Sequence, residues 1–548
     1  MKKIKNIFLL ILFFIPVVLQ AQLWQWANGG GGNNSDQGVH ICNDSAGNLY
    51  VGGSSQFPVS YFNTDTISIN GFNDFFIIKY DANGNEIWIK HFGGPYYSLM
   101  NIKSEGIVSL VFDPVSSSLY ASGHFIDSCN FGITTLFGTN SQLFLSKFDL
   151  NGNCLWATEV GNLGYGEGAR LTTDTNGYIY IAGGISNPAT FDSISLPRGG
   201  FLAKYDTNGN VIWAKNICNV DTQFGESKYR MHQIKYINNS LFIVGLISDS
   251  LTIDTITFNN LNYRSSILSC WDLTGNIKWA EQFGGPSQQN ISSISTDNFG
   301  NIYCTGSFKG MYGVFGADSI QSTDSITGYI VKFDSTQSKI WTKQINVSQN
   351  FTCFNSFSCG DGTFYLTGYF SGLAEFGSYK VSSQTAEDIF VARYNSNGDC
   401  LGIRNTGSGW GYDVISDING NAYLTGRFKN TINFDAFSLT SYGTMDMFIA
   451  KINQFTGIGE LERSSNHTLK IYANPNAGKC NITIPDEFKN ENKLLLSIYD
   501  IHGRIIQQKS LLINTTTINV DLEAFAKGIY SVNLSNGKKT YSGKIVLE

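Results

Sequence analysis

The chain has 548 residues, of which 42% are hydrophobic, 14% aromatic and 15% charged, and its net charge is -6. This length exceeds what one simple core supports, so we expect several domains or a repeat array. The mild negative charge, with no basic cluster beyond the first five residues, excludes a nucleic-acid partner. The low charge content, with 58 glycines, is typical of many short strands joined by polar turns.

The N-terminus has the pattern of a secretory signal peptide, residues 1–21. Lysines lie within the first five residues, an apolar run extends from Ile7 to Leu19, and the small Ala21 follows, which predicts cleavage between Ala21 and Gln22. The alternative is a membrane anchor, but an anchor needs about 20 apolar residues, and this run is shorter and contains Pro16. No later segment is apolar enough to span a bilayer, so we expect no transmembrane segment in the mature chain.

Three short patterns recur in a fixed order along the chain. The first is an aromatic residue followed three residues later by glycine, at Tyr50/Gly53, Tyr120/Gly123, Tyr180/Gly183, Phe242/Gly245, Tyr303/Gly306, Tyr365/Gly368 and Tyr423/Gly426. The second is an apolar run ending in an acid or amide, at Asp81, Asp149, Asp206, Asp272, Asp334, Asn395 and Asn453. The third is a tryptophan seven residues later, at Trp88, Trp156, Trp213, Trp279 and Trp341. The constant offset across sequences such as DANGN and DTNGN predicts a tight hairpin built on Asx turns and glycine.

Each repeat of about 60 residues contains four extended segments bounded by turn residues. They are rich in β-branched and aromatic residues, and no helical period separates them. Four strands at this spacing predict propeller blades, and the repeat count predicts seven of them within residues 22–453.

The ends of the repeat array suggest how the propeller closes. The seventh repeat reaches Asn453 but lacks the tryptophan strand, because Glu460 stands seven residues on. Trp24 lies five residues before Gly29, as Trp88 lies before Gly93. We therefore predict that residues 23–28 pair as the outer strand of the seventh blade, which removes the open edges of a linear array.

These motifs, typified by DNFGNIYCTGSF and GNIKWAEQFGG, resemble the β-propeller repeat family of secreted bacterial proteins. Two local departures stand out: Gly402 holds the place of a tryptophan, and Cys270 stands where other repeats carry Lys or Arg. We expect those blades to pack less tightly.

After residue 453 the repeat pattern stops. Residues 454–466 have the composition of a linker, and residues 467–548 predict about seven strands in a small immunoglobulin-like β-sandwich. This segment resembles the type A sorting domain of the Bacteroidetes type IX secretion system. The residues matching its motif are Asn474, Pro475, Tyr499, Gly503, Gly528, Ile529, Tyr530 and Lys544. The resemblance implies the type IX machinery as a partner, export through the periplasm, and a final place outside the cell or on its outer surface.

No catalytic motif is present, and we expect no enzyme activity and no cofactor. The six histidines form no HExxH pattern, and there is no GxSxG elbow. The ten cysteines are irregularly spaced, which argues against zinc, and the DxNG turns lack the terminal glutamate of a calcium loop, so no metal site is expected.

Propeller geometry places the connections after strands two and four of each blade on one face. These connections are long and carry Tyr96, Tyr97, Tyr165, Trp410 and Tyr412, which we expect to bind a glycan or a surface protein. The alternative is that these aromatic side chains hold their own loops in place. The chain is thus predicted to be all-β, a seven-bladed propeller closed by an N-terminal strand and followed by a sandwich, and to serve in binding or adhesion. There are two alternative functions. The protein is a structural component of the cell surface, or it is a hydrolase or lyase with its site in the propeller channel.

Overall fold

The structure is a computed structural model. It describes residues 23–548 apart from 64, 96–105, 163–168, 186, 220–228, 248–250, 255, 259–264, 285–287, 298, 316–317, 323–325, 360, 456–468, 490–492, 500–504, 513–514 and 536–539. The predicted signal peptide, its cleavage point at Ala21 and Gln22, and most of the linker lie outside the described residues. The chain divides into two compact units, Met1–Phe455 and Thr456–Glu548. The described part is built almost wholly of strands, which confirms the all-β prediction.

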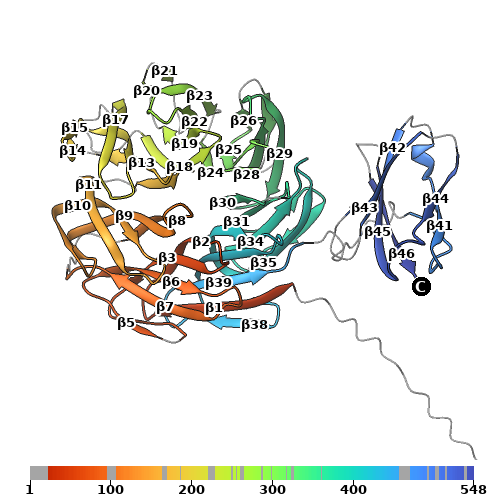
Figure 1. Cartoon of the computed structure of the whole chain (residues 1–548), viewed down its shortest axis with the longest axis horizontal. Helices are drawn as coiled ribbons and strands as arrows, with labels where there is room; N and C mark the ends of the chain where they lie inside the picture. The colour runs from red at the N-terminus through yellow and green to blue at the C-terminus, as the bar shows by residue number, and fades with distance from the viewer. Residues whose placement is uncertain are drawn as a thin grey trace, which may run out of the picture. The chain divides into compact units, whose positions relative to one another are not determined.

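The described residues of the first unit form successive four-stranded antiparallel sheets whose inner strands face a common centre, and short hairpins or a shared strand join several of them into larger sheets (Figure 1). We number these sheets one to seven in chain order and call them blades. Blade one contains β2 (Gln37–Asn43), β3 (Leu49–Gln56), β6 (Asn73–Tyr80) and β7 (Glu86–Phe92). Blade two contains β8 (Gly106–Asp113), β9 (Ser118–Asn130), β10 (Thr135–Phe148) and β11 (Cys154–Asn162). Blade three contains β12 (Arg170–Thr173), β13 (Ile179–Ile185), β16 (Gly199–Tyr205) and β17 (Val211–Asn219). Blades four and five contain β18 (Tyr229–Ile237), β19 (Ser240–Ile247), β22 (Ser265–Trp271) and β23 (Ile277–Gly284); and β24 (Gln289–Thr296), β25 (Ile302–Lys309), β28 (Ile326–Phe333) and β29 (Lys339–Val347).

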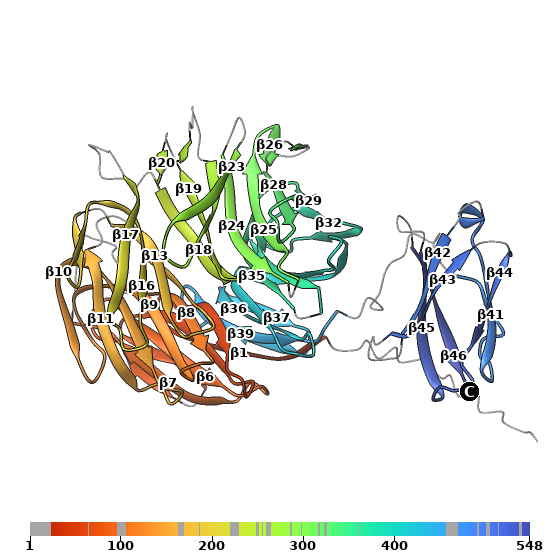
Figure 2. The same ribbon diagram turned by 45° about the horizontal axis from the view of Figure 1, so that its top comes forward.

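Blades six and seven share one long strand. Blade six contains β30 (Phe351–Ser358), β31 (Phe364–Phe370), β34 (Asp388–Tyr394) and the first half of β35 (Cys400–Ser416); blade seven contains the second half of β35, then β36 (Ala422–Phe428), β39 (Asp446–Ile452) and β1 (Trp24–Gly32). Short hairpins lie between the second and third strands: β4 (Val59–Tyr61) with β5 (Thr66–Ser68), β14 (Ala189–Phe191) with β15 (Ile194–Leu196), β20 (Leu251–Ile253) with β21 (Ile256–Phe258), β26 (Tyr312–Phe315) with β27 (Asp318–Gln321), β32 (Leu373–Phe376) with β33 (Tyr379–Ser382), and β37 (Thr431–Phe434) with β38 (Phe437–Thr440). Figure 2 shows β20 and β26 at the upper edge, beyond the main strands of their blades.

The repeated aromatic, basic and tryptophan residues form the contact between neighbouring blades. In blade one, the ring of Tyr50 on β3 lies 6.1 Å from that of Trp88 on β7, and the ammonium group of Lys79 lies 5.2 Å from the Tyr50 ring. The Lys79 ammonium and the Trp88 indole N–H both donate to the carbonyl of Leu150 in the hairpin turn of blade two. The lysine and tryptophan of one blade therefore hydrogen-bond to the turn of the next blade, which explains why these residue types recur at a fixed spacing.

The β3 tyrosine also fixes the turn that precedes it. Its hydroxyl donates to Asp44 at 2.9 Å, and the same contact recurs from Tyr180 to Asp174 and from Tyr303 to Asp297. In the hairpin turns, Asp81 accepts hydrogen bonds from the backbone N–H groups of Asn83 and Asn85. The Asx-turn interpretation of the DxNG sequences is therefore confirmed.

Strand β1 pairs with β39, which is the partner that the sequence predicts for residues 23–28. The register places Trp26 opposite Lys451 and Trp24 opposite Ile452. Trp88 opposes Lys79 in the same way, so Trp26 and not Trp24 is the counterpart of Trp88. The predicted equivalence of Trp24 with Trp88 is wrong by two residues. Trp24 instead packs edge-on against Phe434 of the β37–β38 hairpin, at 4.7 Å between ring centroids.

Two buried carboxyl groups lie against β1 where it leaves blade seven. Asp36 accepts the N–H of Gly32 at 2.7 Å, and Asp446 accepts the N–H of Tyr442 at 2.7 Å. A Cβ atom on Gly31 would lie 2.6 Å from Cγ of Asp446 and 3.0 Å from Oδ2 of Asp36. Burial raises the pKa of Asp446 to about 6, with a further contribution from the charge of Asp36.

This arrangement predicts a pH-dependent gain from Asp446→Asn. The folded-state pKa of Asp446 lies above its usual 3.8. The buried carboxyl group therefore does not destabilise the folded protein below about pH 4, where it is protonated in both the folded and the unfolded state. It destabilises the folded protein fully above about pH 6, where it is ionised in both. We expect the variant to gain up to about 3 kcal/mol at about pH 7.5, because one pKa unit corresponds to about 1.4 kcal/mol. Thermal unfolding of the variant and the parent at about pH 7.5 and at about pH 4 measures this gain. An equal gain at pH 4 would contradict the explanation.

Blade six departs from the pattern at Gly402, and the structure shows how its packing is completed. The space that a tryptophan fills in other blades is occupied by Phe455, whose ring lies 6.2 Å from that of Tyr365. A Cβ atom on Gly402 would lie 2.8 Å from the Phe455 ring. Loose packing of blade six, which the sequence predicts, is therefore wrong: Phe455 and Tyr365 are both buried in one core cluster.

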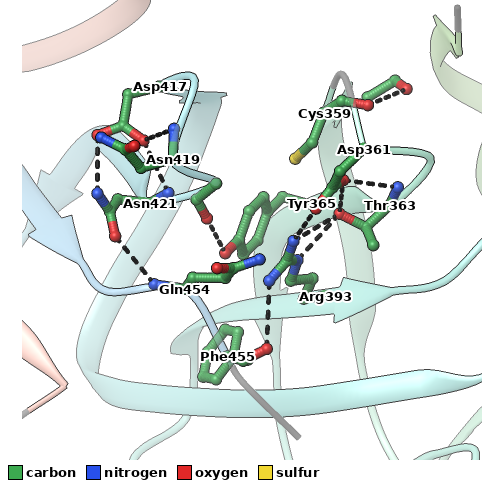
Figure 3. A network of polar contacts seen from close by, with 12 residues as sticks. Cys359, Asp361, Thr363, Tyr365, Arg393, Asp417, Asn419, Asn421, Gln454 and Phe455 are labelled. Carbon is green, nitrogen blue, oxygen red and sulfur yellow. Dashed lines mark hydrogen bonds and ion pairs between the residues drawn. The ribbon is translucent and has the colours of Figure 1, made fainter. Parts of the chain in front are cut away.

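Arg393 holds the backbone of Phe455 in place (Figure 3). Its side chain is 1% exposed, donates to the carbonyl of Phe455 at 3.2 Å, and pairs with Asp361 at 2.6 Å. Arg393 takes the place of the repeat lysine. Phe455 supplies the ring that the tryptophan of the fourth strand supplies in other blades, and also the carbonyl that the turn of the next blade supplies there.

The second unit is a two-sheet sandwich with its own core. One sheet has the order β40 (Ile471–Tyr472), β41 (Lys479–Thr483), β44 (Thr517–Asp521), and the other β43 (Ile505–Leu512), β42 (Lys493–Tyr499), β45 (Gly528–Ser535), β46 (Thr540–Leu547); a 3₁₀ helix, η1, spans Asp486–Phe488. Ile482, Phe488, Ile498 and Val532 are buried between the sheets. The seven strands found among the described residues of this unit agree with the strand count expected from the sequence.

Candidate functional site

The predicted ligand-binding residues fall partly within the described chain. Tyr96, Tyr97 and Tyr165 lie outside the described residues. Trp410 and Tyr412 lie on β35, at the start of its inner-strand half, and are both half-buried.

Trp410 and Tyr412 belong to a cluster of four aromatic rings that spans blades six and seven. Phe354 of β30 lies 5.0 Å from Tyr412 and 6.1 Å from Trp410, and Tyr369 of β31 is stacked on Trp410 at 5.4 Å with an interplanar angle of 20°. We call Phe354, Tyr369, Trp410 and Tyr412 the rim cluster. The sequence prediction missed Phe354 and Tyr369.

Charged side chains fix the rim cluster further. The guanidinium of Arg427 lies 3.8 Å from the centroid of the Trp410 ring, and the indole N–H of Trp410 donates to Glu387 at 2.7 Å. Burial raises the pKa of Tyr412 well above its usual value, so its hydroxyl stays protonated. Trp410 therefore uses its ring and its N–H on neighbours within the protein, whereas Tyr369 borders open space.

A cavity of about 230 Å³ lies beside the rim cluster, between blades five and six. Its lining includes the cation Lys309 together with amide, hydroxyl and aromatic side chains, among them Gln288, Asn290, Asn350, Thr352 and Tyr369. Such side chains donate and accept hydrogen bonds while the ring offers a flat apolar surface. We call this cavity the rim pocket.

A larger cavity of about 490 Å³ lies among the inner strands of the blades. It shares Asn290 and Thr352 with the rim pocket, and Phe354 and Tyr412 of the rim cluster form part of its wall. We call it the channel cavity. Its volume is in the range of small-molecule sites.

The inner strands share a β-bulge next to the channel. In six blades one residue is skipped in the pairing between the first and second strands: Val39, Val108, His232, Ser292, Phe354 and Tyr412. The bulge brings an inner-strand carbonyl against the motif glycine, where a Cβ atom on Gly306 or Gly368 would lie 1.9 Å from that carbonyl oxygen. The repeated glycine is therefore required by this close approach.

Next to the bulge, each inner strand places a polar residue at the same position of the repeat, opposite the residue that precedes the motif glycine. These seven residues are His40, Ser109, Arg170, Gln233, Ser293, Asn355 and Asp413. We call them the polar belt. Their recurrence twelve to fourteen residues before the motif glycine is a sequence signal that could have revealed them.

Hydrogen bonds join much of the polar belt across blade boundaries. The hydroxyl of Ser293 lies 3.1 Å from Oε1 of Gln233 and 2.9 Å from Oδ1 of Asn355, and the amide of Asn355 donates to Asp413. Asp413 also accepts the backbone N–H of Ile41 at 3.0 Å, which joins blade seven to blade one.

Histidine 40 bridges the two opposite charges of the belt. The Arg170 guanidinium donates to its Nε2 at 2.8 Å, so the ring proton lies on Nδ1, which faces Asp413 at 3.3 Å. Burial lowers the pKa of His40, against the effect of Asp413, and favours the neutral ring. Arg170 and Asp413 thus balance each other across a neutral imidazole.

Within the described residues, no group of three or more His, Cys, Asp or Glu side chains is arranged to hold a metal ion. Eight of the ten cysteines are buried. In the part of the chain that the structure describes, no helix has the length and apolar character needed to span a bilayer.

The motif residues of the C-terminal unit hold its last strand. Asn474 donates to the carbonyl of Lys544 at 2.6 Å and accepts the N–H of Val546 at 2.7 Å, so two motif residues contact each other. Gly528 and Tyr530 lie on β45, which pairs with β46. Pro475 follows Asn474 before β41, and Gly503 lies outside the described residues.

Comparison with known families agrees with both parts of this description. Residues 470–548 match the secretion system C-terminal sorting domain, and residues 278–307 match the β-propeller repeat. The chain carries a type IX sorting domain and propeller repeats. Both resemblances inferred from the sequence are confirmed.

Other proteins are similar to this chain at low sequence identity. An uncharacterized WD repeat-containing protein of Acanthamoeba polyphaga mimivirus is 23% identical over 75% of this chain, and the match spans 36% of that protein's length. Among solved structures, an apocarotenoid oxygenase mutant of Synechocystis is 10% identical, with a TM-score of 0.35, over 92% of this chain and 97% of its own. An endo-arabinanase of Bacillus licheniformis is 12% identical, with a TM-score of 0.25, over 57% of this chain and 100% of its own.

Proposed function

We propose that this protein is an exported binding module that holds a glycan at the rim pocket. The sorting domain marks the chain for export, to be secreted or attached to the cell surface. We infer that residues 22–453 form the closed seven-bladed propeller, residues 454–466 the linker, and residues 467–548 the domain that the type IX machinery recognises after passage through the periplasm.

The composition of the rim pocket supports a glycan over an apolar ligand. Sugars present hydroxyl groups at their edges and C–H groups on their faces, so they need amide and hydroxyl partners beside an aromatic ring. Asn350, Gln288 and Tyr369 offer this combination in the rim pocket. The single observation that carries the proposal is this pocket beside a pre-packed aromatic cluster.

The contents of the channel cavity favour binding over glycoside hydrolysis. Hydrolysis of a glycosidic bond generally needs two carboxyl groups on either side of the bond. Among the described residues that line the channel cavity and the rim pocket, Asp413 is the one carboxylate, and it accepts hydrogen bonds from Asn355 and from the backbone of Ile41.

A glycan array with the labelled mature chain, followed by titration of each hit, tests the proposal. We expect Tyr369→Ala and Asn350→Ala each to weaken binding about fivefold to tenfold, because each removes one stacking or hydrogen-bonding partner. Phe299→Ala is the matched control: this ring is 79% exposed in the turn after β24, at the opposite end of the inner strands. An array without hits, or binding that survives both changes, would refute glycan binding at this pocket.

A further inference from the structure

The channel cavity contains a cation that the fold does not require. Lys235 lies on inner strand β18 opposite Phe242 and lines the cavity. The corresponding residues of the other blades, each opposite the motif aromatic, are all uncharged: Cys42, Val111, Thr172, Ser295, Phe357 and Ile415. Six blades therefore form with a neutral residue at this position, and the repeat itself gives no reason for a lysine.

The charge of Lys235 is not balanced within the cavity. The charges of Arg170 and Asp413 offset each other across neutral His40. The carboxylate of Asp413 also accepts hydrogen bonds from the Asn355 amide and the Ile41 backbone N–H. Within the described residues the Lys235 ammonium makes no hydrogen bond or ion pair, and the Asp413 charge acts on it only through space. Burial accordingly lowers the pKa of Lys235, the sign of a cation that the protein solvates poorly.

An ammonium group in such a place favours an anion that enters from outside. Burying an unpaired charge is costly, and an anionic ligand that pairs with it recovers part of that cost. Further side chains with hydrogen-bonding atoms line the same cavity, among them His232 and Asn290. The imidazole of His232 is oriented by a 2.8 Å contact between its Nδ1 and the carbonyl of Ile291.

We propose that the channel cavity binds a small oxyanion, a carboxylate or a phosphate group, with Lys235 as the residue that pairs with its charge. At about 490 Å³ the cavity accepts a ligand of monosaccharide size. Phe354 and Tyr412 form part of the wall, so the rim cluster lies beside this site. The proposal does not depend on glycan binding at the rim pocket.

The test uses the full mature chain with sodium phosphate and sodium glucuronate as probes, against sodium chloride at equal ionic strength. Thermal unfolding and calorimetry measure stabilisation and affinity, since a ligand that binds only the folded state raises the unfolding midpoint. We expect at least one oxyanion to stabilise the parent. Lys235→Gln should weaken that binding about tenfold or more. A larger effect of glucuronate assigns a carboxylate ligand, and a larger effect of phosphate assigns a phosphate ligand.

Two controls separate binding from folding. Lys343→Gln removes a lysine of outer strand β29 that is 39% exposed, and it should leave oxyanion binding unchanged, as should Tyr369→Ala. Lys235→Met in ligand-free buffer should unfold at the same temperature as the parent or higher, because it removes an unpaired charge from a half-buried position. The proposal is wrong if neither oxyanion binds the parent, if Lys235→Gln binds as well as the parent, or if Lys235→Met unfolds well below it.

Discussion

Removal of residues 22–30 from the mature chain should lower the apparent unfolding midpoint by about 10 °C or more. These residues include most of β1, which supplies the outer strand of blade seven. Trp24 is 2% exposed, and Trp26 lies against the hairpin turn of blade one, where a Cβ atom on Gly84 would be 2.6 Å from the indole. Loss of one buried tryptophan costs about 3–5 kcal/mol, so loss of both exceeds the effect of an ordinary substitution.

Deletion of β1 also exposes a new sheet edge. The backbone groups of β39 that pair with Trp24 to Gly30 would become available to another chain. We therefore expect the shortened protein to aggregate on heating as well as to unfold earlier. Differential scanning calorimetry with light scattering measures both effects.

Single substitutions within β1 separate closure from general strand loss. Trp26→Ala should cost about 3–5 kcal/mol because it removes the ring at 6.1 Å from Tyr423 and the indole donor to Ala82. Gln25→Ala, at an exposed position of the same strand, should change stability by less than about 0.5 kcal/mol. A deletion that leaves the unfolding midpoint unchanged would rule out closure of the propeller by β1.

Local patterns predicted the strands and hairpins because the forces that set them act over few residues. The DxNG turns bond their own backbone, so their positions could be inferred from the sequence alone. The register of β1 could not, because strand alternation alone puts Trp24 and Trp26 on one face, whereas a bulge between them places them opposite the consecutive residues Ile452 and Lys451. Gly29 and Gly31 give both tryptophans the same five-residue spacing, and only the partner strand decides that Trp26 opposes Lys451.

The candidate site was less predictable because it is assembled from different blades. Trp410 and Tyr412 were identified as aromatic residues in a connection, but their neighbours Phe354 and Tyr369 come from blade six. The polar belt was hidden for another reason: a bulge before six of the seven belt residues shifts the alternation, so strand period alone does not indicate which side chains meet.

The substitution of Phe455 for a repeat tryptophan was beyond local sequence reasoning. Gly402 and Phe455 are far apart in the sequence and belong to different blades. The pairing predicts a test in which two harmful changes compensate. Phe455→Ala should cost about 3–4 kcal/mol, because it leaves a cavity beside Tyr365. Gly402→Trp alone should also destabilise, because even a Cβ atom at that position would lie 2.8 Å from the Phe455 ring.

The double variant should lose less stability than the sum of the two single losses, and less than Phe455→Ala loses alone. The indole of residue 402 would then enter the space vacated by the phenyl ring and pack against Tyr365, as Trp341 packs against Tyr303 at 6.1 Å. Arg393 would still donate to the backbone carbonyl of residue 455, which neither change removes. Chemical denaturation of the four proteins gives the interaction free energy, which we expect to be favourable by about 1–3 kcal/mol. Additive costs would show that Phe455 does not occupy the tryptophan position of the repeat.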